Sequence, residues 1–141
     1  KSENKYELTD EEFKEGVVTL KKLLNDYMGE RKNMLDVEKK RLRDDFTNCL
    51  ISIRYSMGED AFYNYQADLK TMRRKLYPTI YDSIMIATSI ALGRGYKVKD
   101  SLIERREKLL KDPVYRENIT QGTMRKSAIR TRVEKALEYL K

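Results

Sequence analysis

The chain has 141 residues, a length typical of one domain, with 38% charged and 40% hydrophobic residues. It has no histidine, one cysteine and a net charge of +7, which excludes Ser-His and Cys-His nucleophile pairs, most zinc sites and an internal disulfide. Its longest nearly apolar stretch, Ile84–Leu92, is about half as long as a membrane-spanning helix requires, so we expect a cytoplasmic protein without a membrane partner.

The first two predicted elements are amphipathic helices. Thr9 and Glu12 form a capping-box pattern, and apolar residues then recur at helical spacing until Gly29 ends the helix. A second helix is predicted from about Met34 to Met57, with Gly58 as its stop. Because a short loop joins the two helices, we expect them to pack as an antiparallel pair.

Short helical segments are predicted next, namely a turn at residues 59–63 and a helix at residues 69–76. Pro78 then forces a break, because the residue before a proline is pushed out of the helical region. The following helix, residues 80–92, is apolar almost all round, so we expect it to be buried at the centre. No strand-like alternation of any length is visible.

Three further helices complete the chain. They are predicted at residues 100–111, at 112–119, where Asp-Pro reads as a cap followed by a first-turn proline, and after residues 120–123. We therefore expect a single all-α domain over residues 1–141, an irregular, orthogonal bundle of about six to seven helices around the buried central helix. Because the chain begins at Lys1 instead of Met, we also expect a fragment of a larger multidomain protein.

Carboxylates are the remaining candidates for catalysis. The pairs Asp44-Asp45 and Glu59-Asp60 are adjacent, so on a helix they point about 100° apart and do not converge. We interpret Asp82 as the capping-box partner of Thr79, with a catalytic role as the less favoured alternative. Cys49 lies on an apolar stripe and is interpreted as structural. The sequence therefore predicts no catalytic site, cofactor or metal in this chain.

The charge excess lies in the last third of the chain. Residues 1–93 hold 16 basic and 16 acidic residues, whereas residues 94–141 hold 14 basic and 7 acidic residues. Such asymmetry is typical of a protein with an anionic partner, and a solvated basic face that only aids solubility is the alternative.

Basic clusters gathered by tertiary packing would form a phosphate-binding surface. The candidate nucleic-acid-binding residues are Arg73, Arg74, Arg94, Lys97, Lys99, Arg125, Lys126, Arg130 and Arg132. Tyr77, Tyr81 and Tyr96 offer stacking faces for bases, although core or rim positions are the commoner role of tyrosine in helical domains. Arg132 is the residue we most expect to have a specific role, with helix capping or carbonyl binding as the structural alternative.

The chain from Met57 onwards carries three segments with a family resemblance. They are residues 57–62 (Met-Gly-Glu-Asp-Ala-Phe), residues 74–84 with their basic stretch before a helix, and residues 112–123 followed by Arg132. This part of the chain resembles the helical C-terminal region of a prokaryotic family with an N-terminal ParB/sulfiredoxin-like nuclease domain, typified by the GmrSD modification-dependent restriction proteins.

The resemblance implies a non-catalytic helical segment of a DNA-restriction or phage-defence protein, whose parent is a nuclease or an NTPase. One hypothesis is therefore an accessory domain that contacts DNA through the basic residues 94–132, with other domains of the parent protein as partners. The alternative is a scaffold, protein-interaction or dimerisation module without nucleic-acid contact, which predicts an exposed apolar patch on the first two helices.

Overall fold

The computed structural model describes residues 20–97 and 101–141 of the chain. Its elements in chain order are α1 (Leu20–Glu30), α2 (Asp36–Met57), β1 (Tyr63–Tyr65), β2 (Met72–Leu76), α3 (Pro78–Gly93), α4 (Ile103–Lys111), α5 (Pro113–Thr120) and α6 (Lys126–Leu140). The predicted helical class is confirmed in outline. The small antiparallel sheet of β1 and β2 shows that the described part of the chain is not all-α.

The hairpin replaces the helix that the sequence predicts at residues 69–76, and that prediction is wrong. Asp68 accepts hydrogen bonds from the backbone N–H groups of Lys70 and Thr71 at 3.0 and 3.1 Å, which closes the turn between the strands. Leu69 within this turn has a φ of 55°, in the left-handed region, so no right-handed helix can begin there. The predicted turn at residues 59–63 leads into β1.

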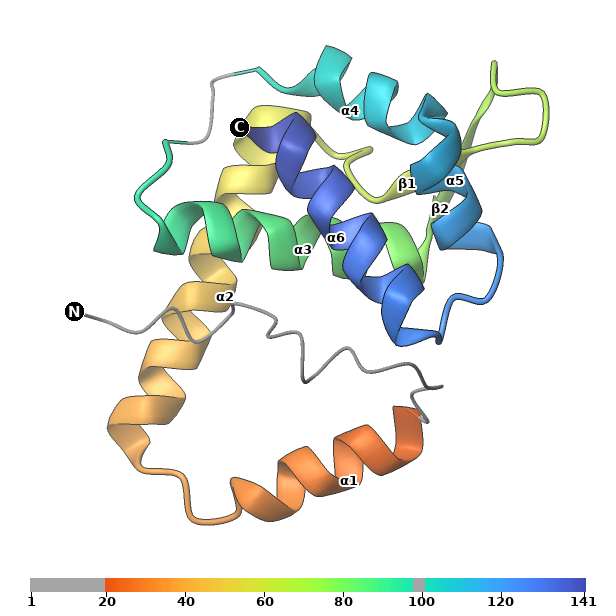
Figure 1. Ribbon diagram of the computed structural model, residues 1–141. Coiled ribbons are helices and arrows are strands. Elements are labelled where there is room, and N and C mark those ends of the chain that lie inside the picture. Colours follow the sequence, from red (N-terminus) through yellow and green to blue (C-terminus); the bar gives the residue numbers. More distant parts are fainter. Residues whose placement is uncertain (1–19, 98–100) are drawn as a thin grey trace.

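Helix α3 contacts both α2 and α6, and no residue from Ile80 to Leu92 is exposed. Figure 1 shows α6 crossing α3, with α4 and α5 covering the side towards the hairpin. The fully buried side chains of this core come from α2 to α6 and include Ile53, Ile80, Ile84, Leu102, Leu109, Leu110, Tyr115 and Ile119. Within the described residues, no helix has the length and apolar character that crossing a membrane requires.

The N-terminal half of α2 and the whole of α1 extend away from this core as an arm, residues 20–48 (Figure 1). The buried residues of α2 begin only at Cys49, and the Leu24, Tyr27 and Met28 side chains of α1 are exposed. The predicted antiparallel packing of the first two helices is therefore wrong, because α1 leads away from α2 and its Leu24, Tyr27 and Met28 side chains stay exposed. The predicted cap at Thr9 lies outside the described residues.

Candidate nucleic-acid interface

The basic residues singled out from the sequence do not form one surface. Arg94 is the C-cap of α3 and Lys97 follows it, so both lie at the C-terminal end of that helix. Arg125 and Lys126 lie at the start of α6. This helix contacts α3 near the N-terminal end of α3, at Asp82. Because α3 has 16 residues, roughly 24 Å separates its two ends at 1.5 Å per residue. Lys99 lies outside the described residues.

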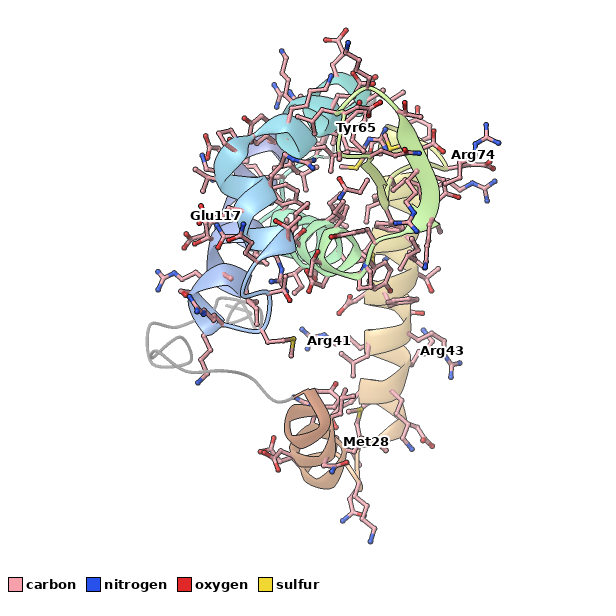
Figure 2. The ribbon with its side chains drawn as sticks, turned by 90° about the vertical axis from the view of Figure 1, so that its right-hand side faces the viewer. Met28, Arg41, Arg43, Tyr65, Arg74 and Glu117 are labelled. Carbon is pink, nitrogen blue, oxygen red and sulfur yellow. The ribbon has the colours of Figure 1, made fainter. Side chains whose placement is uncertain are left out.

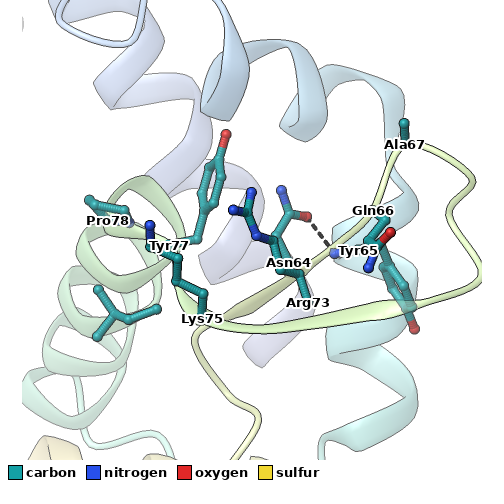
Figure 3. Close-up of a pocket in the computed structure, with 9 residues that line it drawn as sticks. Asn64, Tyr65, Gln66, Ala67, Arg73, Lys75, Tyr77 and Pro78 are labelled. Carbon is teal, nitrogen blue, oxygen red and sulfur yellow. Dashed lines mark hydrogen bonds between the residues drawn. The ribbon is translucent and has the colours of Figure 1, made fainter.

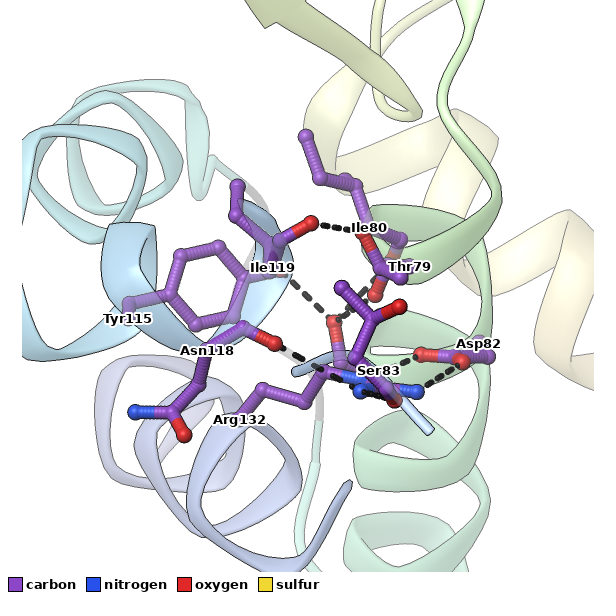
Figure 4. A network of polar contacts seen from close by, with 9 residues as sticks. Thr79, Ile80, Asp82, Ser83, Tyr115, Asn118, Ile119 and Arg132 are labelled. Carbon is purple, nitrogen blue, oxygen red and sulfur yellow. Dashed lines mark hydrogen bonds and ion pairs between the residues drawn. The ribbon is translucent and has the colours of Figure 1, made fainter. Parts of the chain in front are cut away.

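Arg132 is only 3% exposed, so the prediction that it belongs to an exposed patch is wrong. Its Nε and Nη2 donate to the two carboxylate oxygens of Asp82 at 3.0 and 2.6 Å (Figure 4). Its Nη1 donates to the backbone carbonyl of Thr123 at 2.7 Å and, at 3.5 Å, to that of Asn118. Arg132 thus takes the carbonyl-binding structural role and ties α6 to α3 and to the end of α5.

The predicted capping box of Thr79 and Asp82 is also wrong, because α3 has no side-chain cap. The Thr79 hydroxyl instead donates to the carbonyl of Ile119 at 2.9 Å, and the hydroxyls of Ser83 and Tyr115 lie 2.6 Å apart (Figure 4). Burial raises the pKa of the Asp82 carboxyl, and the hydrogen bonds and positive charge of Arg132 only partly offset this effect. Burial also raises the pKa of the Tyr115 hydroxyl. Asp82 therefore helps to hold α3 against α6 and the end of α5.

The basic residues of β2 are arranged differently. Arg73, Arg74 and Lys75 are all exposed, and none forms an ion pair with another residue of the described chain. The pairing of the strands is irregular at Arg74 and Lys75, because Tyr63 pairs with Leu76 but Asn64 pairs with Arg73. Arg73 and Lys75 both line one pocket, whereas Arg74 lies at the outer edge of the hairpin in Figure 2. Arg130, by contrast, pairs with Glu134 at 2.8 Å on the surface of α6.

Arg73 and Lys75 border a pocket of about 600 Å³ between the hairpin and the start of α3 (Figure 3). We call it the hairpin pocket. Among the described residues that line it are two cations and no carboxylate, so its potential is positive. The lining residues are Asn64, Tyr65, Gln66, Ala67, Arg73, Lys75, Leu76, Tyr77 and Pro78.

The Asn64 carboxamide is a fixed polar group in this pocket. Asn64 is 6% exposed, and its Oδ1 accepts hydrogen bonds from the Tyr65 backbone N–H at 2.9 Å and from Arg116 Nη1 at 3.4 Å. Arg116 is held in turn by the carbonyl of Leu110 at 3.0 Å. Two donors on the oxygen set the orientation of the amide, and no hydrogen bond within the described structure uses its NH₂ group. That donor is left for a ligand.

Of the three tyrosines predicted to stack with bases, only Tyr77 lines the hairpin pocket. Tyr81 packs edge-on against Phe62, with 4.9 Å between the ring centroids. Tyr96 lies past the C-terminal end of α3, where Lys141 Nζ sits 5.6 Å from its ring centroid. The Tyr77 ring makes no ring contact with another described residue, and Figure 3 shows it beside the Arg73 guanidinium.

The start of α3 adds to the positive potential of this pocket. Tyr77 is the N-cap residue and Pro78, which has no N–H, is the first residue of the helix, and no side chain caps this end. The N–H groups of Ile80 and Tyr81 donate to the carbonyl of Tyr77 at 3.1 and 2.9 Å. A helix N-terminus carries about half a positive charge, which favours an anion nearby. The backbone position of Tyr77 is fixed because its N–H donates to the carbonyl of Phe62 at 3.0 Å.

A second pocket, of about 610 Å³, lies on the other side of Tyr77 and Pro78. Its charged groups are Asp82 and Arg132, which neutralise each other, and most of the remaining lining is apolar, including Ile86, Ile119, Met124 and Ile129. Arg125 and Lys126 follow directly in the chain after Met124. This pocket offers an anion little attraction, so the hairpin pocket is the stronger candidate interface.

The sequence missed Asn64 and Gln66 as candidates, because only the hairpin places Asn64 opposite Arg73 and Gln66 beside Thr71, next to the basic strand. Among the described residues, no group of three or more acidic or cysteine side chains could hold a metal ion. Compared with known proteins, the sequence matches no protein-family model, and no curated protein or solved structure shows significant similarity to the chain.

Proposed function

We propose that this chain is a non-catalytic accessory domain of a prokaryotic DNA-restriction or phage-defence protein and that it contacts DNA through the hairpin pocket. The observation that carries the DNA contact is the pair Arg73 and Lys75, exposed on β2 and lining a pocket without a carboxylate among its described residues. The resemblance of residues 57–141 supports the wider role. Of the basic residues between 94 and 132 that the sequence predicts to bind DNA, those in the described structure lie away from this pocket or pair with acidic residues of the fold.

A phosphate held by Arg73 and Lys75 displaces condensed counterions, so affinity for DNA falls as salt rises. The logarithm of the binding constant falls against the logarithm of the salt concentration with a slope of about −0.9 per phosphate contact in duplex DNA. Loss of this one phosphate contact therefore reduces the steepness of the slope by about one. This slope separates phosphate contacts from nonspecific attraction to the net charge.

The test is fluorescence anisotropy of a labelled DNA duplex over a series of salt concentrations. We expect the double variant Arg73→Ala/Lys75→Ala to bind more weakly, with a salt slope less steep by about one. The matched control, Lys97→Ala/Lys141→Ala, removes the same charge at the far end of α3 and should bind nearly as the parent protein does. Equal losses in both variants would assign binding to net charge and reject this surface, and no binding at low salt would reject DNA contact altogether.

A second candidate function is self-association through the arm and the exposed face of α2 that continues from it to Tyr55. Large apolar side chains are exposed on α1, on α2 and on the loop between them, namely Leu24, Tyr27, Met28, Leu35, Val37, Phe46, Ile51 and Tyr55. On α2, Ile51 and Tyr55 follow Val37 by about four and five helical turns, so the three share one face. This observation favours a dimer formed by a second copy of the chain.

Sedimentation velocity over a concentration series tests this second candidate. A dimer that dissociates on dilution, and that Val37→Lys/Ile51→Lys abolishes without lowering the thermal midpoint, would support it. A monomer throughout the series would rule out self-association by the arm.

A further inference from the structure

We infer that the hairpin pocket receives a single unpaired nucleotide of a DNA strand. In this arrangement the base stacks on Tyr77, its edge meets the amides of Asn64 and Gln66, and its phosphate lies between Arg73 and Lys75. The inference rests on the proposed function, because it names the form of DNA that the same site takes.

The shape of the site favours a nucleotide over a duplex. At about 600 Å³ the hairpin pocket falls within the range of roughly 300–1,000 Å³ that small-molecule sites occupy. A base within a duplex is stacked and paired, and it reaches a pocket of this kind only by leaving the helix. A flat or convex basic surface would suit duplex phosphates, whereas a concave site with an aromatic wall suits a base.

Tyr77 supplies that aromatic wall. Its ring is half-buried against the core on one side, makes no ring contact with another described residue and lines the pocket. Tyr65 also lines the pocket, but Lys111 Nζ lies over its ring at 5.1 Å from the centroid. Because every base has a π-face, stacking on Tyr77 adds affinity without demanding a particular sequence.

Two amide residues, Asn64 and Gln66, line the pocket in which a base edge would lie. The Asn64 oxygen is already engaged twice, so its NH₂ group is directed to an acceptor on the base. Gln66 is exposed, and its main chain is held in the hairpin because its N–H donates to the carbonyl of Thr71 at 2.8 Å. Amide groups at fixed positions form hydrogen bonds with the edges of unpaired bases, which a duplex conceals.

The phosphate position follows from the cations. Arg73 and Lys75 line the same pocket, and the first residue of α3, Pro78, borders it, so the positive end of the helix dipole lies nearby. A nucleotide with its base on Tyr77 therefore has its charged end among positive groups. The described lining offers no carboxylate that would repel it.

The experiment compares three labelled probes by anisotropy at one salt concentration, using the 141-residue chain. The probes are an oligothymidylate strand, the same strand annealed to its complement, and a duplex that contains one unpaired thymidine. We expect the single strand to bind at least about tenfold more tightly than the perfect duplex, since stacking of one base contributes on the order of tenfold in affinity. The unpaired thymidine should restore most of this difference.

Three variants at two residues assign the effect to the pocket. Tyr77→Leu should weaken single-strand binding about tenfold and leave duplex binding unchanged, whereas Tyr77→Phe, which keeps the ring, should bind as the parent does. Gln66→Ala changes an exposed side chain and therefore tests the pocket without risk to the fold. It should reduce the preference for the single strand.

The outcomes separate this inference from the proposed function. Equal binding of single strand and duplex would overturn the inference and leave the DNA contact standing, whereas failure of all three probes to bind would remove both. Displacement of the strand by an equal concentration of thymidine monophosphate would overturn the inference in favour of a free-nucleotide site. We expect no such displacement, because a mononucleotide lacks the neighbouring phosphates of a strand.

Discussion

Replacing Asp82 with asparagine leaves the Arg132 guanidinium buried without its counterion. Arg132 is 97% buried, and after the substitution its remaining partners are the carbonyls of Thr123 and Asn118. Removing one partner of a buried ion pair typically costs about 3–5 kcal/mol, because the other charge stays desolvated and uncompensated. We therefore expect Asp82→Asn to lose about 3 kcal/mol or more of unfolding free energy.

Removing Arg132 should lower the unfolding free energy by less than removing the Asp82 carboxylate does. In Arg132→Met the stranded group is the Asp82 carboxylate, whose side chain is 37% exposed and therefore reaches water. Methionine also refills much of the buried volume with an adaptable side chain. The carbonyl of Thr123 still loses its donor at 2.7 Å, which prevents the substitution from being neutral.

Urea denaturation followed by far-ultraviolet circular dichroism measures these differences. At a slope of about 1–3 kcal/mol per molar urea, the midpoint of Asp82→Asn should fall by roughly 1–3 M. The double variant Asp82→Asn/Arg132→Met completes a cycle whose coupling energy we expect to exceed about 1 kcal/mol. A loss below about 1 kcal/mol in Asp82→Asn, or a cycle with no coupling, would refute the view that this pair joins α3 to α6.

Three further predictions concern single residues. Asp112→Ala removes the N-cap of α5, whose carboxylate accepts from the Val114 and Tyr115 N–H groups at 2.9 and 3.0 Å, and should cost about 1–2 kcal/mol in urea denaturation. Although burial opposes ionisation of Asp112, hydrogen bonds and the charge of Lys135 hold the pKa of its carboxyl below the ordinary value. The contribution of Asp112 to the unfolding free energy is therefore complete at neutral pH and is lost as acid protonates the carboxylate below about pH 4. Below that pH, Asp112→Ala should reduce stability by less than it does at neutral pH. Burial raises the pKa of the Cys49 thiol, so we expect a thiol reagent to react with it rapidly only after unfolding. Gly58→Ala places a side chain at a φ of 77° and should lower stability by about 1–2 kcal/mol in the same assay.

The elements that the sequence located well are those with local signals. Asp112 caps α5 and Pro113 is its first residue, as predicted, because a side-chain oxygen and a proline act within a few residues of themselves. Gly58 likewise ends α2 with a positive φ. A signal that operates over three or four residues can be interpreted without knowledge of the fold.

The hairpin lacked such a signal. Of the five residues of β2 only Met72 is even partly buried, so the apolar alternation that marks a half-buried strand is absent. The turn places Leu69 at a positive φ where glycine or asparagine would have indicated it. The pairing of Asn64 with Arg73 is what forms the hairpin pocket, and it depends on the whole fold.

The role of Arg132 shows the same limit in the candidate site. The sequence singled out this residue but assigned it to a surface, because its partner Asp82 lies 50 positions earlier in the chain. An isolated charge on an amphipathic helix is ordinarily solvated, and only the approach of α3 to α6 turns this one into a buried pair.

The two candidate functions occupy surfaces with opposite physical character, and ionic strength therefore separates them. On the exposed arm three basic residues pair with aspartates, Lys39 with Asp36, Lys40 with Asp44 and Arg41 with Asp45. The two cations of the hairpin pocket have no acidic partner in the described structure. Salt screens the pocket's attraction for phosphate but leaves apolar burial on the arm nearly unchanged. If DNA binding required an arm-mediated dimer, the variants of the arm would weaken it without changing its salt slope. If the pocket binds DNA without a dimer, the variants of the arm would have the same DNA affinity and the same salt slope as the parent protein.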